Sequence, residues 1–409
     1  MGVPQQVVIV GGGIGGVSTA AALRSGGFSG EITLVDDAQH PLDRPPLSKE
    51  YLAGTRGLTD IALEQPEWYD DHEVRLLART RVAALRPDEG VVETEDGRTL
   101  AASRVVIATG GRAARPAIPG ADSDRVHVLR SVDDADRLRA AASPGARFLV
   151  VGAGLIGAEI ASTLTGLGSD VTLVDIVSPP LSQVVGEPVA RWLHEVHRAH
   201  GVTLRQCGVE RFEPIGAGPD APLTAHLTHG QGSVVVDRAV LALGMVPETR
   251  LARAAGLDTG RGVIVDRRQV TSNPAVLAIG DATEVRVDGA VVPRAEHWEA
   301  ARFDGERAAA TILGNPPPPL TASWFWTDRH GLHVEVVGDL AAGNLVVRGT
   351  LGSPPFSAFA LRDGVVVGAV AVDDSKAVRA ARRLIDRAIL VDAEAVADPS
   401  TDLRRLVRG

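Results

Sequence analysis

Two glycine-rich turns of the same design constrain the fold of this 409-residue chain most strongly. Each has the pattern Gly-x-Gly-x-x-Gly, follows an apolar run typical of a buried strand, and precedes a run of helical composition. The glycines are Gly11, Gly13 and Gly16 in the first turn, and Gly152, Gly154 and Gly157 in the second. A second strand after each helical run, at residues 31–35 and 170–174, completes a βαβ unit. Because the two units lie far apart in the sequence, they predict two doubly wound α/β domains rather than a short-period repeat.

An acidic residue follows each turn by about 20 residues, the distance expected of a dinucleotide site. Asp36, with Asp37 beside it, has this position in the first unit, and Asp175 has it in the second. In such sites the glycines allow a tight turn and close approach of the backbone to a pyrophosphate, while the carboxylate accepts hydrogen bonds from ribose hydroxyls. A purely structural glycine-rich turn would share the motif, but the full context occurs here twice. We therefore expect two dinucleotides, which suggests a flavoprotein reduced by a nicotinamide.

Asp175 indicates which nicotinamide the second unit takes. A carboxylate repels the 2′-phosphate of NADPH, and the next residues, Ile176, Val177 and Ser178, include no arginine or lysine that would neutralise this phosphate. The sequence therefore predicts a preference for NADH over NADPH.

The composition narrows the class of protein further. A net charge of −9, from 42 basic and 51 acidic residues, argues against a general nucleic-acid binder, whose affinity depends on neutralising phosphates. The single cysteine, Cys207, excludes a disulfide within the chain and a cysteine-based zinc or iron–sulfur site, and it fits a reducing compartment. No targeting signal precedes the first strand, and no run approaches the roughly 20 apolar residues that span a bilayer. We expect a cytoplasmic protein that binds neither nucleic acid nor membrane.

Further patterns divide the chain into parts. Apolar runs at residues 104–108, 238–242 and 276–279 end in loops that contain Gly110, Gly244 and Gly280, as strands of parallel sheets do. Four prolines at 316–319 predict a stiff linker. Beyond them, residues 332–337, 345–348, 356–361 and 365–372 alternate like strands of an antiparallel sheet, and residues 379–390 have the composition of a helix.

Several short segments are specific enough to carry a resemblance to a known family. They are residues 44–49 (RPPLSK), 108–111 (ATGG), 129–131 (LRS), 152–159 (GAGLIGAE), 271–274 (TSNP), 278–281 (AIGD), 296–298 (EHW), 324–328 (WFWTD) and 361–364 (LRDG). Over essentially its whole length the chain resembles the FAD-dependent, NADH-using ferredoxin reductases of bacterial oxygenase and cytochrome P450 systems, the putidaredoxin reductase type. RPPLSK and the Trp-Phe-Trp segment are the family-specific elements, whereas the Gly-Asp element is shared by many flavoproteins.

The resemblance implies an α/β fold with two Rossmann-like dinucleotide-binding domains in a glutathione-reductase-like arrangement, followed by a C-terminal α+β domain. The FAD domain is expected to be discontinuous, at residues 1–112 and 246–318. The NAD domain is expected at residues 113–245, and the C-terminal interface domain at residues 319–409.

The resemblance also implies roles for single residues. Lys49 is expected beside the reactive flavin nitrogen, where a cation stabilises the electrons that arrive with hydride, and Glu159 is expected to hold Lys49 in place. These two are the expected catalytic residues, and no metal ligands are expected. The residues expected at FAD are Gly11, Gly13, Gly15, Gly16, Asp36, Asp37, Arg44, Lys49, Val82, Ala108, Thr109, Gly110, Arg130, Asp281 and Trp298. Those expected at NADH are Gly152, Gly154, Leu155, Ile156, Gly157, Glu159, Asp175 and Gly244.

Within the FAD set the resemblance is more specific. Asp36 or Asp37 would hold the adenosine ribose, and Val82 would meet the adenine through its backbone. Arg130 would lie near the pyrophosphate, Asp281 would bind the ribityl–phosphate region, and Trp298 would back onto the edge of the flavin ring. The residues alone leave other interpretations open, because a lysine after two prolines is often solvated and a tryptophan at a helix start often serves packing.

Six positions depart from the family pattern: Leu42, Glu248, Leu277, Phe303, Arg329 and His330. The first three are expected to adjust packing. The last three lie where the flavin surroundings or the partner would be affected, so they leave the identity of the partner open.

The position of the cysteine indicates how electrons leave. No cysteine occurs in residues 41–52, where related disulfide reductases and peroxide-reducing or water-forming enzymes carry theirs, and Cys207 is expected to be a buried apolar thiol. Without a thiol relay, a flavin that receives two electrons together must pass them directly to another acceptor. An iron–sulfur ferredoxin, which takes one electron at a time, fits best, and its cluster must be on the partner.

Basic residues at three- and four-residue spacings, Lys376, Arg379, Arg382, Arg383 and Arg387, form either a docking face for an acidic ferredoxin or a solvated helix surface. We expect NADH-dependent reduction of a ferredoxin that supplies a cytochrome P450 or a ring-hydroxylating oxygenase. Two alternatives are an NADH oxidase or quinone-type reductase, and a redox-gated binding flavoprotein similar to apoptosis-inducing factor.

Overall fold

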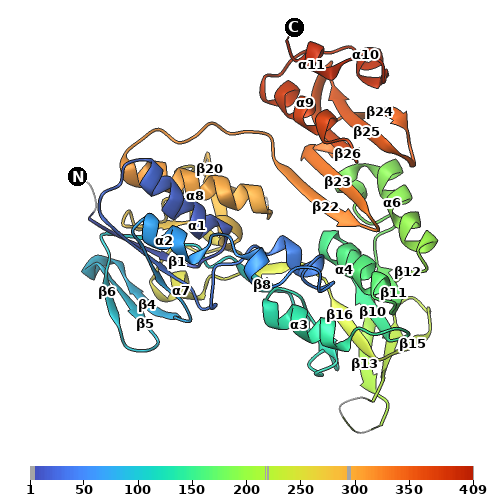
Figure 1. Ribbon diagram of the computed structural model, residues 1–409, viewed down its shortest axis with the longest axis horizontal. Helices are drawn as coiled ribbons and strands as arrows, with labels where there is room; N and C mark the ends of the chain where they lie inside the picture. The colour runs from blue at the N-terminus through green and yellow to red at the C-terminus, as the bar shows by residue number, and fades with distance from the viewer. Residues whose placement is uncertain (1–4, 217, 219–220, 293–295, 409) are drawn as a thin grey trace. The chain divides into compact units, whose positions relative to one another are not determined.

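The computed structural model describes residues 5–216, 218, 221–292 and 296–408 (Figure 1). The chain divides into two compact units, each assembled from three separated segments. The first unit comprises Met1–Pro45, Gly57–Arg112 and Met245–Leu320, and the second comprises Pro46–Arg56, Ala113–Gly244 and Thr321–Gly409. The four prolines at 316–319 lie directly before the last passage of the chain from the first unit to the second.

The first unit is built on a five-stranded parallel sheet in the order β19-β7-β1-β2-β3. The strands are β1 Gln6–Val10, β2 Glu31–Val35, β3 Val74–Leu77, β7 Arg104–Ile107 and β19 Val276–Ala278. In the central strand β1, Val7 and Ile9 face one side of the sheet, and Val8 and Val10 face the other. Because both faces of a parallel sheet are covered, this strand is continuously apolar rather than alternating.

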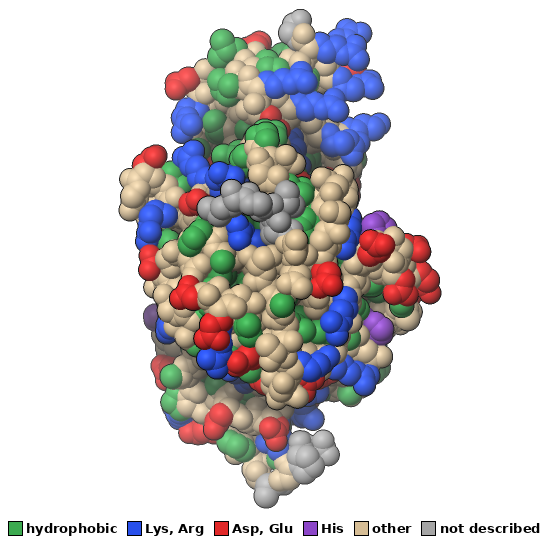
Figure 2. Space-filling model, turned by 90° about the vertical axis from the view of Figure 1, so that its left-hand side faces the viewer, with side chains coloured by type: hydrophobic (Ala, Val, Ile, Leu, Met, Phe, Trp, Pro, Cys, Tyr) green, Lys and Arg blue, Asp and Glu red, His purple; other side chains and the backbone are tan. Residues whose placement is uncertain are grey.

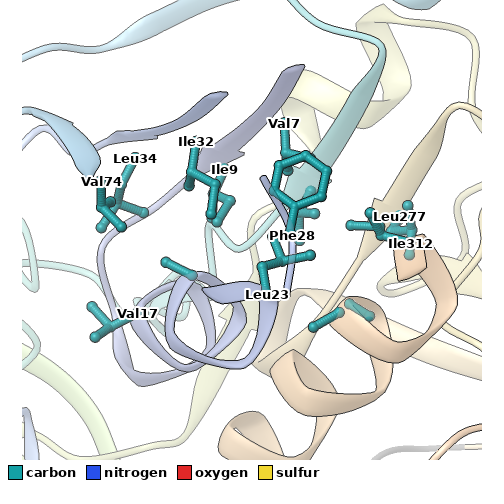
Figure 3. Packing of buried hydrophobic residues seen from close by; sticks show 14 of the residues in the cluster. Val7, Ile9, Val17, Leu23, Phe28, Ile32, Leu34, Val74, Leu277 and Ile312 are labelled. Carbon is teal, nitrogen blue, oxygen red and sulfur yellow. The ribbon is translucent and has the colours of Figure 1, made fainter. Parts of the chain in front are cut away.

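Helices α1 Ile14–Ser25 and α8 Trp298–Leu313 pack on one face of this sheet (Figure 3). Leu23 of α1 and Ile312 of α8 are buried there with Ile9 and Leu34, and Leu23, Ile9 and Leu34 have no exposed surface. Burial of each such side chain stabilises the fold by about 1.5–3 kcal/mol. This core holds the amino end of α1 at the end of β1, where the first glycine turn lies.

Small sheets and helices complete the first unit. They are β4 Val82–Arg86, β5 Val91–Thr94 and β6 Thr99–Ala101; β18 Val263–Val265, β20 Thr283–Val287 and β21 Ala290–Val292; β8 Gly111–Ala113 with β17 Met245–Pro247; and the helices α2 Pro66–Asp71 and α7 Arg250–Ala254.

The second unit repeats the parallel arrangement with strand order β12-β11-β10-β16-β9. Its strands are β9 Val126–His127, β10 Arg147–Val151, β11 Asp170–Asp175, β12 Thr203–Gln206 and β16 Arg238–Leu241, and its helices are α3 Val132–Ala141, α4 Leu155–Gly166, α5 Ser182–Val185 and α6 Glu187–Ala199. An antiparallel sheet adds β13 Val209–Pro214, β14 Leu223–Leu227 and β15 Ser233–Val236.

The C-terminal part of the second unit is an antiparallel sheet in the order β22-β23-β26-β25-β24. Its elements are β22 Trp324–Arg329, β23 Leu332–Gly338, β24 Asn344–Thr350, β25 Ser353–Arg362, β26 Val365–Val372, α9 Ser375–Asp386, α10 Ala393–Ala397 and α11 Leu403–Leu406. Helix α9 covers one face of this sheet, and helices α5 and α6 pack against the other face. The C-terminal sheet therefore shares a core with the segment that contains the second glycine turn.

Two elements differ from the sequence prediction. The last long helix is α9 at Ser375–Asp386 rather than residues 379–390, because the Asp374 side chain accepts a hydrogen bond from the backbone N–H of Ala377 and starts the helix earlier. Strand β22 was not expected, since its sequence WFWTDR lacks a clear apolar–polar alternation. The strands expected at 332–337, 345–348, 356–361 and 365–372 are confirmed as β23 to β26, with small differences at their ends.

Within the described ranges, we find no helix with the combination of length and apolar character that crossing a membrane requires. Nor do His, Cys, Asp and Glu side chains of these ranges gather in threes in a way that would hold a metal ion.

Candidate functional site

The first glycine turn is closed by contacts that glycine alone permits. Gly11 has a φ of +116°, and a Cβ on it would lie 2.3 Å from the carbonyl oxygen of Ala108. A Cβ on Gly16 would lie 2.0 Å from the carbonyl oxygen of Gly11, so this glycine lets α1 pack against the end of β1. Gly13, the N-cap of α1, instead faces open space, with no heavy atom within 4 Å of a Cβ built there. The turn leaves a cradle at the first amides of α1 that fits a pyrophosphate.

Of the two neighbouring acids, Asp36 is the one at the glycine turn. A Cβ on Gly12 would lie 2.3 Å from its Oδ2 atom. Burial raises the pKa of Asp36 above its ordinary value, with a further contribution from Asp37, while Arg44 opposes the shift. Asp37 is exposed and forms an ion pair with Arg81 at 3.0 Å. The geometry therefore favours Asp36 over Asp37 as a ligand for a ribose.

The second glycine turn repeats the construction of the first. Gly152 has a φ of +98°, and a Cβ on it would lie 2.4 Å from the carbonyl oxygen of Ala242. A Cβ on Gly157 would lie 1.9 Å from the carbonyl oxygen of Gly152, whereas Gly154 again faces open space. The two turns thus offer the same open amide cradle at the amino ends of α1 and α4.

Asp175, the last residue of β11, reaches the second turn directly. Its Oδ2 accepts a hydrogen bond from the backbone N–H of Ala153 at 2.7 Å, and its Oδ1 accepts one from the backbone N–H of Val177 at 2.8 Å.

Large apolar side chains are exposed near the carboxyl ends of β10, β11 and β16. They are Ile156 (47%), Ile176 (67%), Val177 (51%) and Leu243 (38%). Such a rim beside an amide cradle fits a ligand with both apolar rings and phosphates. Leu155 begins α4, and Gly244 follows β16 with a φ of +90°.

The other residues expected at FAD in the first unit lie on its loops and near the starts of α1, β4 and α8. The Thr109 hydroxyl donates to the carbonyl oxygen of Glu248 at 3.1 Å, and the Gly110 carbonyl accepts from the backbone N–H of Glu248 at 2.9 Å. The indole N–H of Trp298 donates to Asp43 at 2.8 Å. Gly15 is buried, Val82, Ala108 and Asp281 are half-buried, and Arg44 is exposed.

One buried acid that the sequence did not indicate supports the Gly280–Ala282 turn. Asp304 of α8 has no exposed surface and accepts hydrogen bonds from the backbone N–H of Gly280 at 3.2 Å and from the side-chain amide of Gln269 at 3.1 Å. Arg307 is its ion-pair partner at 3.3 Å. These contacts fix the turn that carries Asp281.

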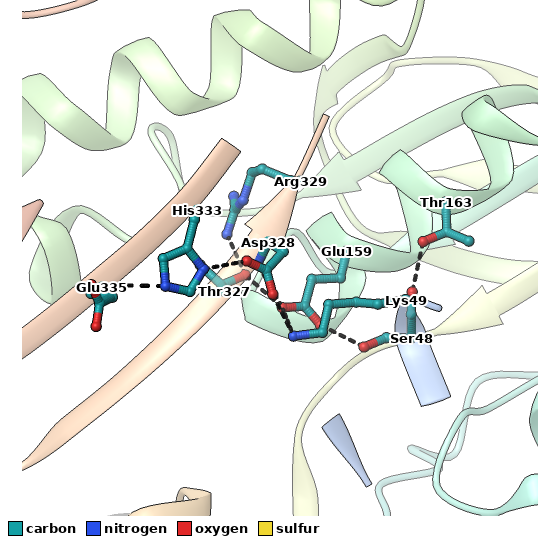
Figure 4. Close-up of polar contacts among 9 residues, drawn as sticks. All are labelled: Ser48, Lys49, Glu159, Thr163, Thr327, Asp328, Arg329, His333 and Glu335. Carbon is teal, nitrogen blue, oxygen red and sulfur yellow. Dashed lines mark hydrogen bonds and ion pairs between the residues drawn. The ribbon is translucent and has the colours of Figure 1, made fainter. Parts of the chain in front are cut away.

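In the second unit, Lys49 lies in a cluster of charged and polar side chains (Figure 4). Its Nζ atom lies 2.7 Å from Asp328 Oδ2, 3.8 Å from Glu159 Oε1 and 5.2 Å from the centre of the Trp326 ring. Only 10% of the Lys49 side chain is exposed. Lys49 and Glu159, which the resemblance pairs, are therefore brought together, but Asp328 is the nearer acid.

Local structure explains why Lys49 is held so firmly. Pro45 and Pro46 start a short 3₁₀ helix, and the backbone N–H of Lys49 donates to the carbonyl oxygen of Pro46 at 3.0 Å. The Thr163 hydroxyl of α4 donates to the carbonyl oxygen of Ser48 at 2.7 Å. The RPPLSK segment is thus fastened to α4, the helix that carries Glu159.

Glu159 is buried, and its carboxylate accepts hydrogen bonds from neighbouring protein groups. Ser48 donates to Oε2, while the Thr327 hydroxyl and the backbone N–H of Asp328 donate to Oε1 at 2.8 and 3.1 Å. Burial raises the pKa of Glu159 above its ordinary value, and the charge of Lys49 is the largest opposing effect. The carboxylate therefore depends on Lys49 to remain charged.

Asp328 and Arg329 of β22 complete the charged cluster. Burial acts to raise the pKa of Asp328, but its hydrogen bonds with Lys49 and His333 outweigh this effect and lower the pKa. Arg329 is 3% exposed, its guanidinium donates to the Thr327 hydroxyl at 3.2 Å, and burial lowers its pKa to about 10. Two cations and two carboxylates thus share this small volume.

The roles of Asp328 and His333 were missed by the sequence prediction, although one signal for the cluster was available. Lys49 is one of only two lysines among 42 basic residues, the other being Lys376. Because lysine and arginine are not interchangeable in an enclosed ion pair, a rare lysine in an arginine-rich chain is a candidate for such a site. The partners Glu159 and Asp328 are distant from Lys49 in the sequence, and only the folded chain identifies them.

Other sequence expectations in the second unit have local structural explanations. The backbone N–H of Arg130 donates to Asp134 at 3.0 Å, beside the capping box of α3. His330 Nε2 lies 2.8 Å from Nδ1 of the buried His197 on α6, and burial lowers the pKa of both imidazoles. Cys207 has no exposed surface, and burial raises its pKa, so it is an inert thiol.

Two protein families match consecutive parts of this chain. The family of pyridine nucleotide-disulphide oxidoreductases matches residues 5–305, and the reductase C-terminal family matches residues 324–407. The chain is 34% identical to the ferredoxin–NAD(+) reductase subunit of the benzene 1,2-dioxygenase system of Pseudomonas putida, over 98% of this chain and 97% of that protein.

Among solved structures, the covalent putidaredoxin reductase–putidaredoxin complex matches with a TM-score of 0.91 and 31% identity, over 99% of this chain and 98% of that one. The ferredoxin reductase of the CYP199A2 system from Rhodopseudomonas palustris matches with a TM-score of 0.92 and 28% identity, over 98% and 100% of the two chains.

Proposed function

Because this chain belongs to the pyridine nucleotide-disulphide oxidoreductase family, we propose that it is an NADH-dependent ferredoxin reductase that supplies a cytochrome P450 or a ring-hydroxylating oxygenase. The observation that carries the proposal is the pair of equivalent glycine cradles in one chain that matches ferredoxin reductases over nearly their full length. The buried state of Cys207 supports direct transfer of electrons to a partner, because the described residues contain no accessible thiol.

FAD fits the first cradle and NADH the second. We assign residues 1–112 and 246–318 to the FAD domain, 113–245 to the NAD domain and 319–409 to the C-terminal interface domain. Bound FAD would accept the two electrons of a hydride together and release them singly. Asp36 would bind the adenosine ribose of FAD, and Asp175 would bind that of NADH. We expect the protein in the cytoplasm, where NADH is supplied.

Lys49 and Glu159 are the proposed catalytic pair. Lys49 presents a positive charge that is mostly shielded from water, which strengthens its attraction to the negative charge that accompanies hydride. Glu159 and Asp328 hold the ammonium group from two sides. The Trp326 ring adds a cation–π contact and covers the lysine.

Replacement of Asp175 with arginine should shift the preference from NADH toward NADPH. In the present chain a 2′-phosphate would approach the Asp175 carboxylate, whereas arginine would pair with it, and each charge-assisted contact contributes about 1.5–3 kcal/mol. We expect the ratio of kcat/KM for NADH to that for NADPH to fall at least about tenfold, since about 1.4 kcal/mol corresponds to a factor of ten. Asp170→Arg, on the exposed start of β11, is the matched control and should leave the ratio unchanged. An unchanged ratio in Asp175→Arg would rule out this role.

The exposed basic residues of helix α9 support docking of a ferredoxin. Lys376, Arg379, Arg383 and Arg387 are exposed along one side of α9 and its C-cap, while Arg382 turns toward Thr321, to which it donates a hydrogen bond at 2.9 Å. Lys and Arg side chains also gather over the C-terminal part of the chain at the top right of Figure 2. This face fits an acidic protein partner.

The test is NADH-driven reduction of cytochrome c with a panel of ferredoxins. At least one ferredoxin should stimulate the rate, and added salt should weaken the stimulation, because ions screen the encounter. Arg379→Glu together with Arg383→Glu should raise the apparent KM for that ferredoxin about tenfold or more, with reduction of ferricyanide unchanged. No stimulation by any ferredoxin, with rapid consumption of O₂, would favour the NADH oxidase alternative. A long-lived reduced complex with NAD⁺ that changes oligomeric state would favour the redox-gated binding protein.

A further inference from the structure

One face of the β22–β23 ladder collects polar and aromatic side chains around Lys49. The two strands pair in antiparallel register, with Asp328 opposite His333 and Trp326 opposite Glu335. Because side chains on a strand alternate between faces, these four residues lie on the same side of the ladder. The neighbouring Trp324 donates its indole N–H to Glu335 at 3.1 Å and stacks on Trp326 at 5.1 Å.

Close contacts on this face lead from the enclosed lysine to the surface. Lys49 Nζ donates to Asp328 Oδ2 at 2.7 Å, and Asp328 Oδ1 lies 2.6 Å from His333 Nδ1 (Figure 4). The exposed fraction of the side chains rises along this path, from 10% for Lys49 through 35% for Asp328 to 42% for His333. Both distances allow a proton to be passed from one group to the next.

The other polar branch from Lys49 remains inside the protein. Glu159, at 3.8 Å, is 7% exposed in its side chain, and its hydrogen bonds come from Ser48, Thr327 and the backbone of Asp328. Arg329 retains its proton at neutral pH and is itself buried. Among the described residues of this branch, Glu159 and Arg329 are the titratable groups near Lys49. Both are much less exposed to water than His333.

The proposed reaction has to release a proton. NADH and two oxidised one-electron acceptors yield NAD⁺, two reduced acceptors and one proton, since a hydride consists of two electrons and a proton. We propose that Asp328 and His333 conduct this proton from Lys49 to solvent. This inference rests on the proposed function, and specifically on the expected position of Lys49 beside the flavin.

Each step of the proposed path passes one proton on and receives one in return. Lys49 gives a proton from Nζ to the Asp328 carboxylate and regains one from the reaction. The Asp328 carboxyl group then passes its proton to Nδ1 of a His333 that carries its own hydrogen on Nε2, and the resulting imidazolium releases the Nε2 proton to water.

Acidic residues lie on several sides of His333. Glu335 lies 3.8 Å from Nε2, and Asp328 lies at Nδ1. From the loop after β26, Asp373 accepts a hydrogen bond from the His333 backbone N–H at 2.9 Å. Two acidic side chains thus lie at the imidazole and a third at the His333 backbone, and Lys49 lies on the far side of Asp328.

The experiment compares His333→Gln with His226→Gln in the FAD-loaded enzyme. His226 is a matched control, because its Nε2 also contacts a carboxylate, Glu213 at 2.9 Å, but on β14. The enzyme is reduced with one equivalent of NADH and mixed with ferricyanide in weakly buffered solution that contains a pH indicator. The times of flavin reoxidation and of proton release are recorded together.

We expect His333→Gln to slow proton release about tenfold or more, given the size of general acid–base effects. Reduction by NADH should be unaffected, because that step releases no proton. Added imidazole should restore the rate, since the site of His333 is accessible to water, and the solvent deuterium isotope effect should increase. Asp328→Asn, which interrupts the path before His333, should be slow and should not respond to imidazole. A merely structural role of His333 would produce neither difference.

Proton release by His333→Gln at the rate of the His226→Gln control would overturn the proposal, as would a slow variant that imidazole does not restore. His333→Asn provides a second variant if glutamine disturbs the strand. Because ferricyanide replaces ferredoxin, the result is independent of whether any ferredoxin is a partner. Failure of the ferredoxin panel would instead contradict the proposed function.

Discussion

Replacing Lys49 with methionine should lower the free energy of unfolding by about 3–5 kcal/mol, because it leaves the buried Glu159 carboxylate without its cation. It should also slow reduction of the flavin by NADH about 100-fold, the size of effect that loss of one enclosed electrostatic contact produces. Urea denaturation measures the first effect, and the absorbance of the flavin after rapid mixing with NADH measures the second.

The stability loss in Lys49→Met should depend on pH. The pKa of Glu159 is already raised by burial, and removal of Lys49, the largest effect that lowers it, raises it further. A carboxyl group with a raised pKa in the folded state favours folding below its unfolded pKa and loses that contribution as the pH rises through the folded pKa. The deficit relative to the unmodified protein should therefore be larger in mildly alkaline than in mildly acidic solution.

Lys376→Met is the matched control, because it removes the only other lysine from an exposed position on α9. An exposed substitution of this kind changes stability by no more than about 0.5 kcal/mol. If Lys49→Met is as stable as this control and is reduced by NADH at the same rate, Lys49 is neither a structural cation nor a catalytic one.

Alanine at Gly157 and alanine at Gly154 should both weaken NADH binding, for different reasons. At Gly157 the new Cβ would lie 1.9 Å from the carbonyl oxygen of Gly152 and 3.0 Å from the Ala242 side chain, so α4 must move away from β10. Overpacking of this kind destabilises a protein by about 1–3 kcal/mol. At Gly154 the Cβ meets no protein atom, and the methyl group enters only the space proposed for the pyrophosphate. We expect an unchanged midpoint of thermal unfolding there but a KM for NADH raised about tenfold or more.

Gly166→Ala, at the exposed end of α4, controls for substitution within the same helix and should stabilise it by about 0.5–1 kcal/mol. Bound FAD, measured by absorbance after purification, should be unchanged in all three variants, because its proposed cradle lies in the first unit. Normal NADH affinity in the stable Gly154→Ala variant would show that the second cradle does not hold the nucleotide.

The repeated α/β architecture could be predicted from the sequence because it depends on local patterns. The run at residues 7–10, the glycines after it and the acid at residue 36 indicate the strand, the turn and the proposed ribose-binding position within one short segment. The sequence alone does not distinguish Asp36 from Asp37 as the proposed ribose ligand. Both acids have the right spacing, and only the contact of Asp36 with Gly12 separates it from the exposed Asp37.

The Lys49 cluster could be predicted only in part. The pairing with Glu159 came from the resemblance, whereas the role of Asp328 depends on the register of β22 with β23. The sequence of β22 shows no alternation of apolar and polar residues, because both faces of the strand contain polar side chains. Trp324, Trp326 and Asp328 line the face near Lys49, and the intervening Thr327 and Arg329 are buried on the other.

The scarcity of lysine has a practical consequence for this enzyme. A protein grown with lysine labelled at Cε contains two labelled positions, one on the exposed surface of α9 and one enclosed by Trp326 and two carboxylates. A single substitution at residue 376 therefore assigns both nuclear magnetic resonance signals. The charge of the proposed catalytic amine can then be followed directly through oxidation and reduction, without a reporter group and without inference from rates.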